Sequence, residues 1–111
     1  MADKITTEEL KKKLDAGEEV YLIDALSEKS YGARHVPGAK NVPYRPNFIT
    51  DFEKEVGAPK DAEIITYCAS SGCQLSVLAA DALEEAGYTN VKHFEDGLAG
   101  WQNAGYKFEE S

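Results

Sequence analysis

Short apolar runs and longer amphipathic stretches alternate along the chain, and each predicts a different kind of element. The short runs contain β-branched side chains and indicate buried strands, whereas the longer stretches repeat apolar side chains every third or fourth residue, as helices do. The runs that predict strands span residues 20–24, 63–67 and 91–94, with a short edge strand over 41–43. Strands separated by helices favour parallel pairing, so the pattern predicts an α/β sheet covered by helices on both faces.

The helices are predicted by their caps as well as by their apolar spacing. The first helix, over residues 7–16, begins with a capping box in which the side chains of Thr6 and Glu9 bond each other's backbone N–H groups. The most periodic helix begins near Gln74 and ends at Gly87. Its apolar positions are Leu75, Leu78, Ala79, Ala82, Leu83 and Ala86. We expect the remaining helical segments over residues 27–35, 47–56 and 98–104.

The size and charge of the chain indicate how many domains it has and which partners it does not bind. A length of 111 residues, 42 % of them hydrophobic, suits one compact domain over residues 1–111. A net charge of −8 argues against nucleic acid and anionic membranes as partners, because both need clustered Lys and Arg. No apolar run is long enough to span a membrane or to form the core of a signal peptide. We therefore expect a cytoplasmic location.

The number and spacing of the cysteines and histidines argue against a disulfide scaffold and against a zinc site. Two cysteines are too few for a disulfide scaffold. The spacing of Cys68 and Cys73, with His35 and His93 far away in sequence, is not one that binds zinc, so we expect no metal. In open α/β sheets, ligands bind beyond the carboxyl ends of the strands. That rule selects the segment after Asp24 and the loop that begins at Cys68.

The loop after Cys68 has the composition of an anion-binding turn. Its residues are Ala69, Ser70, Ser71, Gly72, Cys73 and Gln74. Small residues allow successive backbone N–H groups to converge on one centre, and the following helix adds its positive end. Such a loop would stabilise a thiolate at Cys68, or a sulfur atom carried on it, and make the thiol a nucleophile. The alternative is that Cys68 is only a small buried residue at a strand end.

Several segments together resemble the rhodanese-like (sulfurtransferase) domain over residues 5–107. Each segment alone is a weak match, but together they keep the order and suitable spacing that this family has, which is specific. They are the opening helix from Ile5 to Leu10, the strand Leu22–Asp24, Tyr31 followed by His35–Ala39, the active-loop Cys68, Ala86–Tyr88, and Gly97–Trp101.

The resemblance implies both an architecture and a reaction. The fold would be a three-layer α/β domain with a central, mainly parallel five-stranded sheet. Cys68 would take sulfur from a donor such as thiosulfate or a persulfide, hold it as a cysteine persulfide, and pass it to a small-molecule or protein thiol acceptor. This two-step covalent route gives ping-pong kinetics and needs no cofactor. We expect a monomer.

The active loop departs from the common pattern of this family. The family's loop usually reads Cys-Arg-x-Gly-x-Arg-Ser, whereas this one resembles a subgroup with Cys-Ala-x-x-x-Cys-x-x-Ser and contains no cation. Gln74 stands six residues after Cys68, where the related cysteine phosphatases carry the arginine that binds phosphate, which argues against phosphatase activity. Arg34 and Arg45 are the only arginines, and each either approaches the site or lies solvated on the surface.

Four further residues are candidates for supporting roles at the site. Cys73 either reacts with Cys68, by resolving a persulfide or receiving its sulfur, or points into the core. Asp24 either bonds backbone beneath the site or transfers protons, and His35 either anchors the turn at Pro37 or acts as a base. Trp101 is expected to be a core anchor beside the mouth of the site.

Three functions therefore compete. The first is sulfur transfer through Cys68, the second a weakly active rhodanese-like protein-binding module, and the third a dithiol redox sensor that uses Cys68 and Cys73. Residues 56–111 hold three lysines against nine acids, a net charge of −6 in the half that carries the nucleophile. This acidity predicts weak turnover of dianionic thiosulfate and a preference for a less charged persulfide or a basic protein donor.

Overall fold

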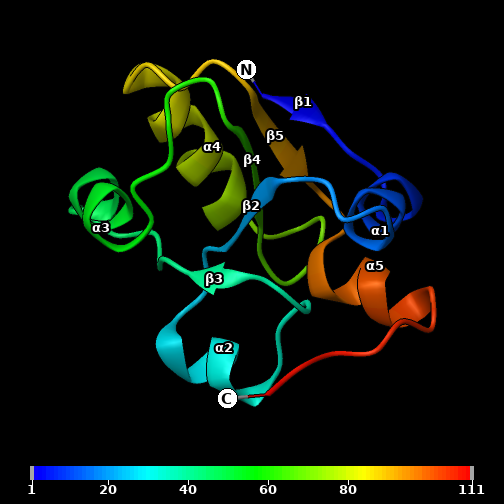
Figure 1. The fold of residues 1–111 in the computed structure, drawn as a ribbon. Helices are drawn as coiled ribbons and strands as arrows, with labels where there is room; N and C mark the ends of the chain where they lie inside the picture. The colour runs from blue at the N-terminus through cyan, green and yellow to red at the C-terminus, as the bar shows by residue number, and fades with distance from the viewer. Residues whose placement is uncertain (1, 111) are drawn as a thin grey trace.

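The computed structural model describes residues 2–110, which form a five-stranded parallel sheet between two layers of helices. The strand order is β1-β5-β4-β2-β3, so the strand that precedes the cysteine loop is central (Figure 1). The strands are β1 (Asp3–Lys4), β2 (Val20–Asp24), β3 (Lys40–Asn41), β4 (Glu63–Tyr67) and β5 (Val91–Phe94). Every pairing between these five strands is parallel.

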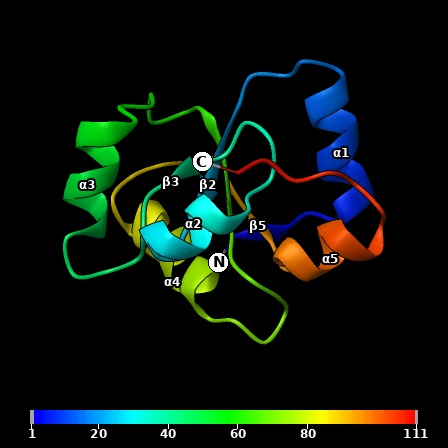
Figure 2. The same cartoon turned by 90° about the horizontal axis from the view of Figure 1, so that it is seen from below.

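The helices divide between the two faces of the sheet. They are α1 (Thr7–Asp15), α2 (Glu28–Ala33), α3 (Phe48–Glu55), α4 (Leu75–Glu85) and α5 (Gly97–Asn103). Figures 1 and 2 agree that α3 and α4 lie on one side and α1 and α5 on the other, with α2 near the C-terminus of the chain. Among residues 2–110, no helix has the length and apolar character needed to cross a membrane.

Alternation along the strands fills two separate cores. On β4, Ile64 packs into the cluster beneath α3 and α4, with Phe52 and Leu83. The next residue, Ile65, faces the opposite cluster beneath α1 and α5, with Leu10. Both faces of the central strand are therefore buried, and each fully buried side chain of this size contributes about 1.5–3 kcal/mol.

The predicted elements are confirmed, with one omission and one shift, since the edge strand expected over 41–43 is β3 at Lys40–Asn41. The capping box at the start of α1 is present, with Thr6 Oγ1 accepting from the Glu9 N–H at 3.1 Å. The short strand β1 was missed, because Asp3 and Lys4 are exposed and give no apolar signal. It supplies the fifth strand by pairing beside β5, as the resemblance implied.

The buried face of α4 was predicted only in part. Ala79 and Leu83 are buried as expected, but Leu78 is 45 % exposed. The helix turns Ser76 and Ala80 inward in its place, both only 1 % exposed. Apolar spacing misplaced this face because a buried serine cannot be distinguished from an exposed one by hydropathy.

The register of the sheet places the candidate site at its carboxyl edge. Asp24 pairs with Tyr67 across β2 and β4, and Tyr67 pairs with Phe94 across β4 and β5. All three strands therefore end at the same level, and Cys68 leaves the sheet between its two neighbours. This is the position at which open α/β sheets bind ligands.

Candidate active site

Cys68 is held by backbone hydrogen bonds from the segment that follows β5. The Leu98 N–H donates to the carbonyl oxygen of Cys68 at 3.0 Å, and the Ala99 N–H donates to that of Ala69 at 2.9 Å. The side chain of Cys68 is buried, with the residue 1 % exposed. The start of the loop is thus fixed against the N-terminus of α5 rather than being a free connection.

Gly97 allows this close approach between the two segments. Its φ is +58°, a conformation that L side chains rarely adopt. A Cβ at this position would collide with the carbonyl oxygen of Cys68 and lie 3.0 Å from the carbonyl carbon of Ala69. The glycine of the Gly97–Trp101 segment is therefore required by the position of the cysteine loop.

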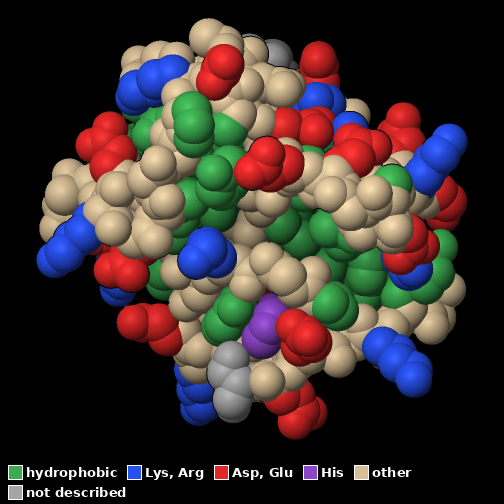
Figure 3. All heavy atoms as spheres, viewed as in Figure 1, with side chains coloured by type: hydrophobic (Ala, Val, Ile, Leu, Met, Phe, Trp, Pro, Cys, Tyr) green, Lys and Arg blue, Asp and Glu red, His purple; other side chains and the backbone are tan. Residues whose placement is uncertain are grey.

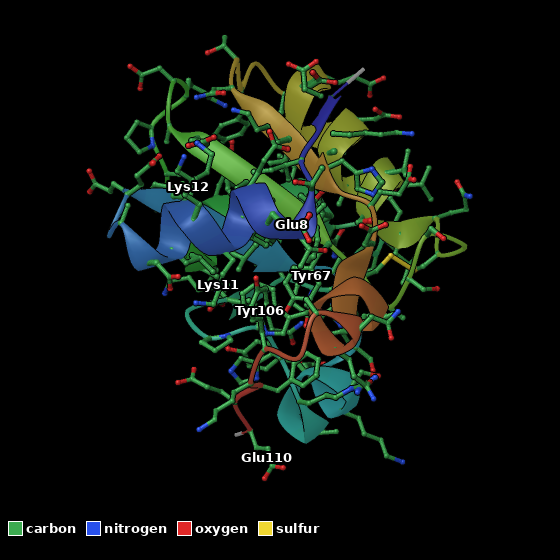
Figure 4. All side chains as sticks on the ribbon, turned by 90° about the vertical axis from the view of Figure 1, so that its right-hand side faces the viewer. Glu8, Lys11, Lys12, Tyr67, Tyr106 and Glu110 are labelled. Carbon is green, nitrogen blue, oxygen red and sulfur yellow. A yellow bond between two sulfur atoms is a disulfide. The ribbon has the colours of Figure 1, made fainter. Side chains whose placement is uncertain are left out.

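Cys68 and Cys73 form a disulfide across the loop. Their Cα atoms are 6.3 Å apart, within the range that disulfides span, and Figure 4 shows the bond in yellow beside α4. The Cys73 N–H also donates to the carbonyl oxygen of Ser70 at 3.0 Å, which closes a turn between the two cysteines. Of the alternatives for Cys73, the structure places its sulfur against Cys68 rather than in the core.

Ser76 connects the buried sulfur to a histidine. Ser76 Oγ lies 3.2 Å from Cys68 Sγ and 2.8 Å from His93 Nε2. Ser76 stands in the first turn of α4 and His93 on β5, and both are buried. The carbonyl oxygen of Ser76 accepts a hydrogen bond from Thr66 Oγ1 at 2.9 Å, which fixes the start of α4 to β4.

The environment of His93 favours its neutral form. Burial lowers the pKa of the His93 imidazole, partly offset by the nearby carboxylate of Glu95, while Lys4 lowers the pKa further and Asp81 raises it. The ring also borders a cavity of about 110 Å³ that these three charged residues help to line. A neutral imidazole has one nitrogen that can accept a proton.

A larger cavity, of about 440 Å³, opens beside the cysteine loop. Ser70 and Ser71 line it from the loop, Asp96 and Gly100 from the start of α5, and Glu8 from α1. Glu8 is labelled in Figure 4. Its described lining contains two carboxylates and no Lys or Arg, so the space next to the loop is acidic. On the face drawn in Figure 3, acidic and basic side chains are interspersed, and the basic ones do not gather into a patch.

Asp24 is a buried carboxyl at the end of β2. Its Oδ1 accepts a hydrogen bond from the Leu26 N–H at 2.8 Å. Burial raises the pKa of Asp24, opposed by the hydrogen bond from the Leu26 N–H and by the nearby Tyr67 hydroxyl. Burial also raises the pKa of Tyr67, whose hydroxyl oxygen accepts from the Val36 N–H at 3.1 Å. The backbone-bonding role expected of Asp24 matches this geometry.

His35 and Trp101 make structural contacts. The His35 ring stacks on Tyr31 with centroids 3.8 Å apart, and its Nδ1 lies 2.9 Å from the carbonyl oxygen of Tyr31. Trp101 is 2 % exposed, and its Nε1 donates to the carbonyl oxygen of Lys107 at 2.9 Å. Both residues therefore tie loops to the cores rather than face the sulfur of Cys68.

Neither arginine pairs with the cysteine loop. Arg34 Nη1 donates to Gln102 Oε1 at 2.6 Å and its guanidinium lies over the Phe108 ring. Arg45 is half-exposed and pairs with Asp51 at 3.3 Å and with Glu28 at 3.9 Å. The interactions described for these side chains thus leave the loop without a basic partner.

Comparison with known proteins places these features in a family. The rhodanese-like domain family matches residues 6–104, which is most of the chain. This chain belongs to the rhodanese-like domain family. The fold agrees: a thiosulfate sulfurtransferase from Pseudomonas aeruginosa superposes with a TM-score of 0.84 at 25 % identity, covering 98 % of this chain and 20 % of that one.

Relatives of this rhodanese-like domain differ in length. The transcriptional regulator Rv0324 of Mycobacterium tuberculosis, described as HTH-type, is 34 % identical over 97 % of this chain and 45 % of its own. The putative sulfurtransferase YtwF of Bacillus subtilis is 31 % identical over 89 % of each chain. A probable adenylyltransferase/sulfurtransferase, MoeZ of Mycobacterium tuberculosis, is 29 % identical over 87 % of this chain and 24 % of its own. This chain therefore spans less than half of the mycobacterial relatives.

Two residues near the cysteine of this rhodanese-like domain were not predicted from its sequence. Ser76 appeared only as the last position of the loop pattern, and His93 had no visible partner. Their place follows from the sheet register, which the sequence pattern does not state. Thr66 pairs with His93 across β4 and β5, and side chains two apart on a strand share a face, so Cys68 follows on the face that carries His93.

Proposed function

We propose that this rhodanese-like domain transfers sulfane sulfur through a persulfide on Cys68. The observation that carries the proposal is the position of Cys68, at the carboxyl end of the central strand and next to the Ser76 hydroxyl. The sulfurtransferase names of relatives support the reaction class. Reduction of the disulfide with Cys73 must precede the reaction, because the nucleophile is a free thiolate.

The chemistry divides into two displacements. The Cys68 thiolate attacks the outer sulfur of a persulfide donor, forming Cys68–S–SH and releasing the donor's thiolate. With thiosulfate, the same attack forms the anion of the Cys68 persulfide and releases sulfite. A nucleophile such as cyanide or a thiolate then attacks the outer sulfur and leaves the Cys68 thiolate. Splitting the transfer in this way is covalent catalysis and gives ping-pong kinetics.

The acidic cavity supports a preference among donors. Glu8 and Asp96 line the space next to the loop, and two negative charges there repel a dianion such as thiosulfate. A persulfide carries less charge, and a basic protein would be attracted. We therefore assign a low-charge persulfide or a basic protein persulfide as the donor class, with a small-molecule or protein thiol as acceptor in the cytoplasm.

The test compares donors on the reduced protein. Thiosulfate and a low-molecular-weight persulfide are incubated with it separately, and the intact mass is recorded before and after cyanide is added. We expect the mass to increase by one sulfur atom, in a larger fraction of the protein with the persulfide than with thiosulfate. Cyanide should remove this sulfur as thiocyanate. Cys68→Ser is the inactive variant, and Cys73→Ser is the control that keeps the proposed nucleophile. Absence of an adduct from either donor would favour a protein-binding module instead.

A second candidate function is dithiol–disulfide chemistry, which the bond between Cys68 and Cys73 favours. The Cys73 thiolate would attack Sγ of a Cys68 persulfide, expel hydrosulfide and form this disulfide, so that no external oxidant is needed. A reducing dithiol would then attack Sγ of Cys73 and not that of Cys68, because Cys73 is only partly buried whereas Cys68 is 1 % exposed. A relative that is a transcriptional regulator is consistent with such a sensing role.

This second function has its own measurement. The persulfidated protein, separated from excess donor, should release sulfide and lose the mass of one hydrogen sulfide molecule as the disulfide forms. Cys73→Ser should retain the persulfide under the same conditions. Equal sulfide release from both proteins would remove Cys73 from the reaction, and the sulfurtransferase proposal would stand without it.

A further inference from the structure

Three buried polar side chains form a continuous chain from the cysteine into the sheet. Cys68 Sγ lies 3.2 Å from Ser76 Oγ, which lies 2.8 Å from His93 Nε2. The three residues are 1 %, 1 % and 6 % exposed, in that order. They come from the residue after β4, the first turn of α4 and the strand β5, so only the folded chain brings them together.

Once the disulfide with Cys73 is reduced, each atom of this chain can pass a proton to the next. A thiol and a hydroxyl each donate one hydrogen and accept others, and a neutral imidazole accepts at its unprotonated nitrogen. The ring of His93 borders the 110 Å³ cavity with Lys4, Asp81 and Glu95, which belong to β1, α4 and the residue after β5. The two carboxylates favour a protonated ring, whereas burial and Lys4 oppose it.

We propose that Ser76 and His93 form a proton relay for Cys68, an inference that rests on the proposed sulfurtransferase function. The Cys68 thiol gives its proton to Ser76 Oγ while the Ser76 hydroxyl proton passes to His93 Nε2. The products are a Cys68 thiolate, a Ser76 hydroxyl and a His93 imidazolium. The proton returns by the same route when the acceptor takes the sulfur and the Cys68 thiolate is released.

The relay provides what the active loop lacks. Residues 68–74 contain no Lys or Arg, so the loop has no cation of its own to stabilise a thiolate. The imidazolium places a positive charge behind Ser76, and the Ser76 hydroxyl then donates to the thiolate. Ser76 touches the reacting sulfur, whereas His93 is a positioning residue that acts through Ser76. A cationic partner of this kind shifts thiol ionisation from about pH 8.5 towards neutrality.

The test measures ionisation of Cys68 directly. In Cys73→Ser the remaining thiol is Cys68, and its thiolate is followed by ultraviolet absorbance as the pH is raised. Adding His93→Gln or Ser76→Ala should move the midpoint upward by about one pH unit or more. Gln keeps a hydrogen bond to Ser76 but cannot take up the proton. Ser76→Thr retains the hydroxyl, so its midpoint should lie close to that of Cys73→Ser alone.

His35→Gln in the same Cys73→Ser protein is the matched control. His35 is also buried, at 5 % exposure, but it stacks on Tyr31 and does not contact Cys68. Its substitution should leave the midpoint unchanged, and circular dichroism establishes that each variant is folded. If His93→Gln prevents folding, Ser76→Ala supplies the same comparison.

The outcomes separate the relay from the reaction it serves. An unchanged midpoint in folded His93→Gln and Ser76→Ala overturns the relay, even if Cys68 still accepts sulfur. A higher midpoint in both, with no sulfur adduct from any donor, supports the relay and overturns the sulfurtransferase proposal. Lower stability without a change in midpoint means that His93 has a structural role only and also overturns the relay.

Discussion

Gly97→Ala tests whether the cysteine loop is positioned by its contact with the start of α5. The φ of +58° costs an L residue about 1–2 kcal/mol. The added Cβ would also collide with the carbonyl oxygen of Cys68, and overpacking of this kind costs about 1–3 kcal/mol. We therefore expect the variant to lose about 2–5 kcal/mol of unfolding free energy. Displacement of Cys68 should also lower its rate of persulfide formation.

Gly105→Ala is the matched control for this variant. Gly105 has a φ of +82°, but no heavy atom lies within 4 Å of the Cβ it would acquire. Its substitution should cost only the conformational part, about 1–2 kcal/mol, and leave sulfur transfer unaffected. Urea unfolding of the reduced proteins measures both losses. Equal destabilisation by the two substitutions would show that the contact between Gly97 and the cysteine loop is not the source of strain.

Three further predictions concern charge and redox state. Burial raises the pKa of Asp24 above its unfolded value, so the folded protein binds more protons and its stability falls as the pH rises from the unfolded pKa through the folded one. Asp24→Asn should therefore gain stability over wild type as the pH rises above about 4, by about 1.4 kcal/mol for every pH unit that separates the two pKa values, whereas exposed Asp61→Asn should not. Sulfur transfer from thiosulfate should accelerate with added salt and in Glu8→Gln, because the cavity beside the loop is acidic; a rate independent of both would refute this electrostatic argument. The oxidised wild-type protein should exceed Cys73→Ser in unfolding free energy by about 2 kcal/mol, because the disulfide closes a short loop in the unfolded chain. If the difference persists after reduction, the disulfide is not its cause.

Local patterns were sufficient to predict most of the fold. The strand 63–67 is apolar over most of its length because both its faces are buried, and the capping box at Thr6 is a short-range interaction that spacing alone reveals. The exceptions have physical causes. Strand β1 has only two residues, both exposed, and it forms because β5 offers a free edge. Leu78 follows the helical repeat, yet the helix turns Ser76 inward towards His93 and Cys68.

The position of the candidate cysteine was predicted from the sequence, but its surroundings were not. The position of Cys68 at a strand end and the composition of the loop after it can both be read from adjacent residues in the sequence, so they were sufficient to select this cysteine. Its contacts with Ser76 and, through it, His93 depend on which strand lies beside β4, and the sequence pattern does not state that order. The pairing of Cys73 was left open for a related reason, because the four loop residues between the cysteines allow the two sulfur atoms to meet or to diverge. Long-range register, rather than residue type, is the missing information.

The central claim is that Cys68 carries sulfur between a donor and an acceptor. Intact-mass measurement of the reduced protein after exposure to a low-molecular-weight persulfide tests it most directly. We predict one added sulfur atom in wild type and in Cys73→Ser, its absence in Cys68→Ser, and its removal as thiocyanate by cyanide. An adduct that persists in Cys68→Ser, or a folded and reduced wild-type protein that accepts no sulfur, would contradict the account.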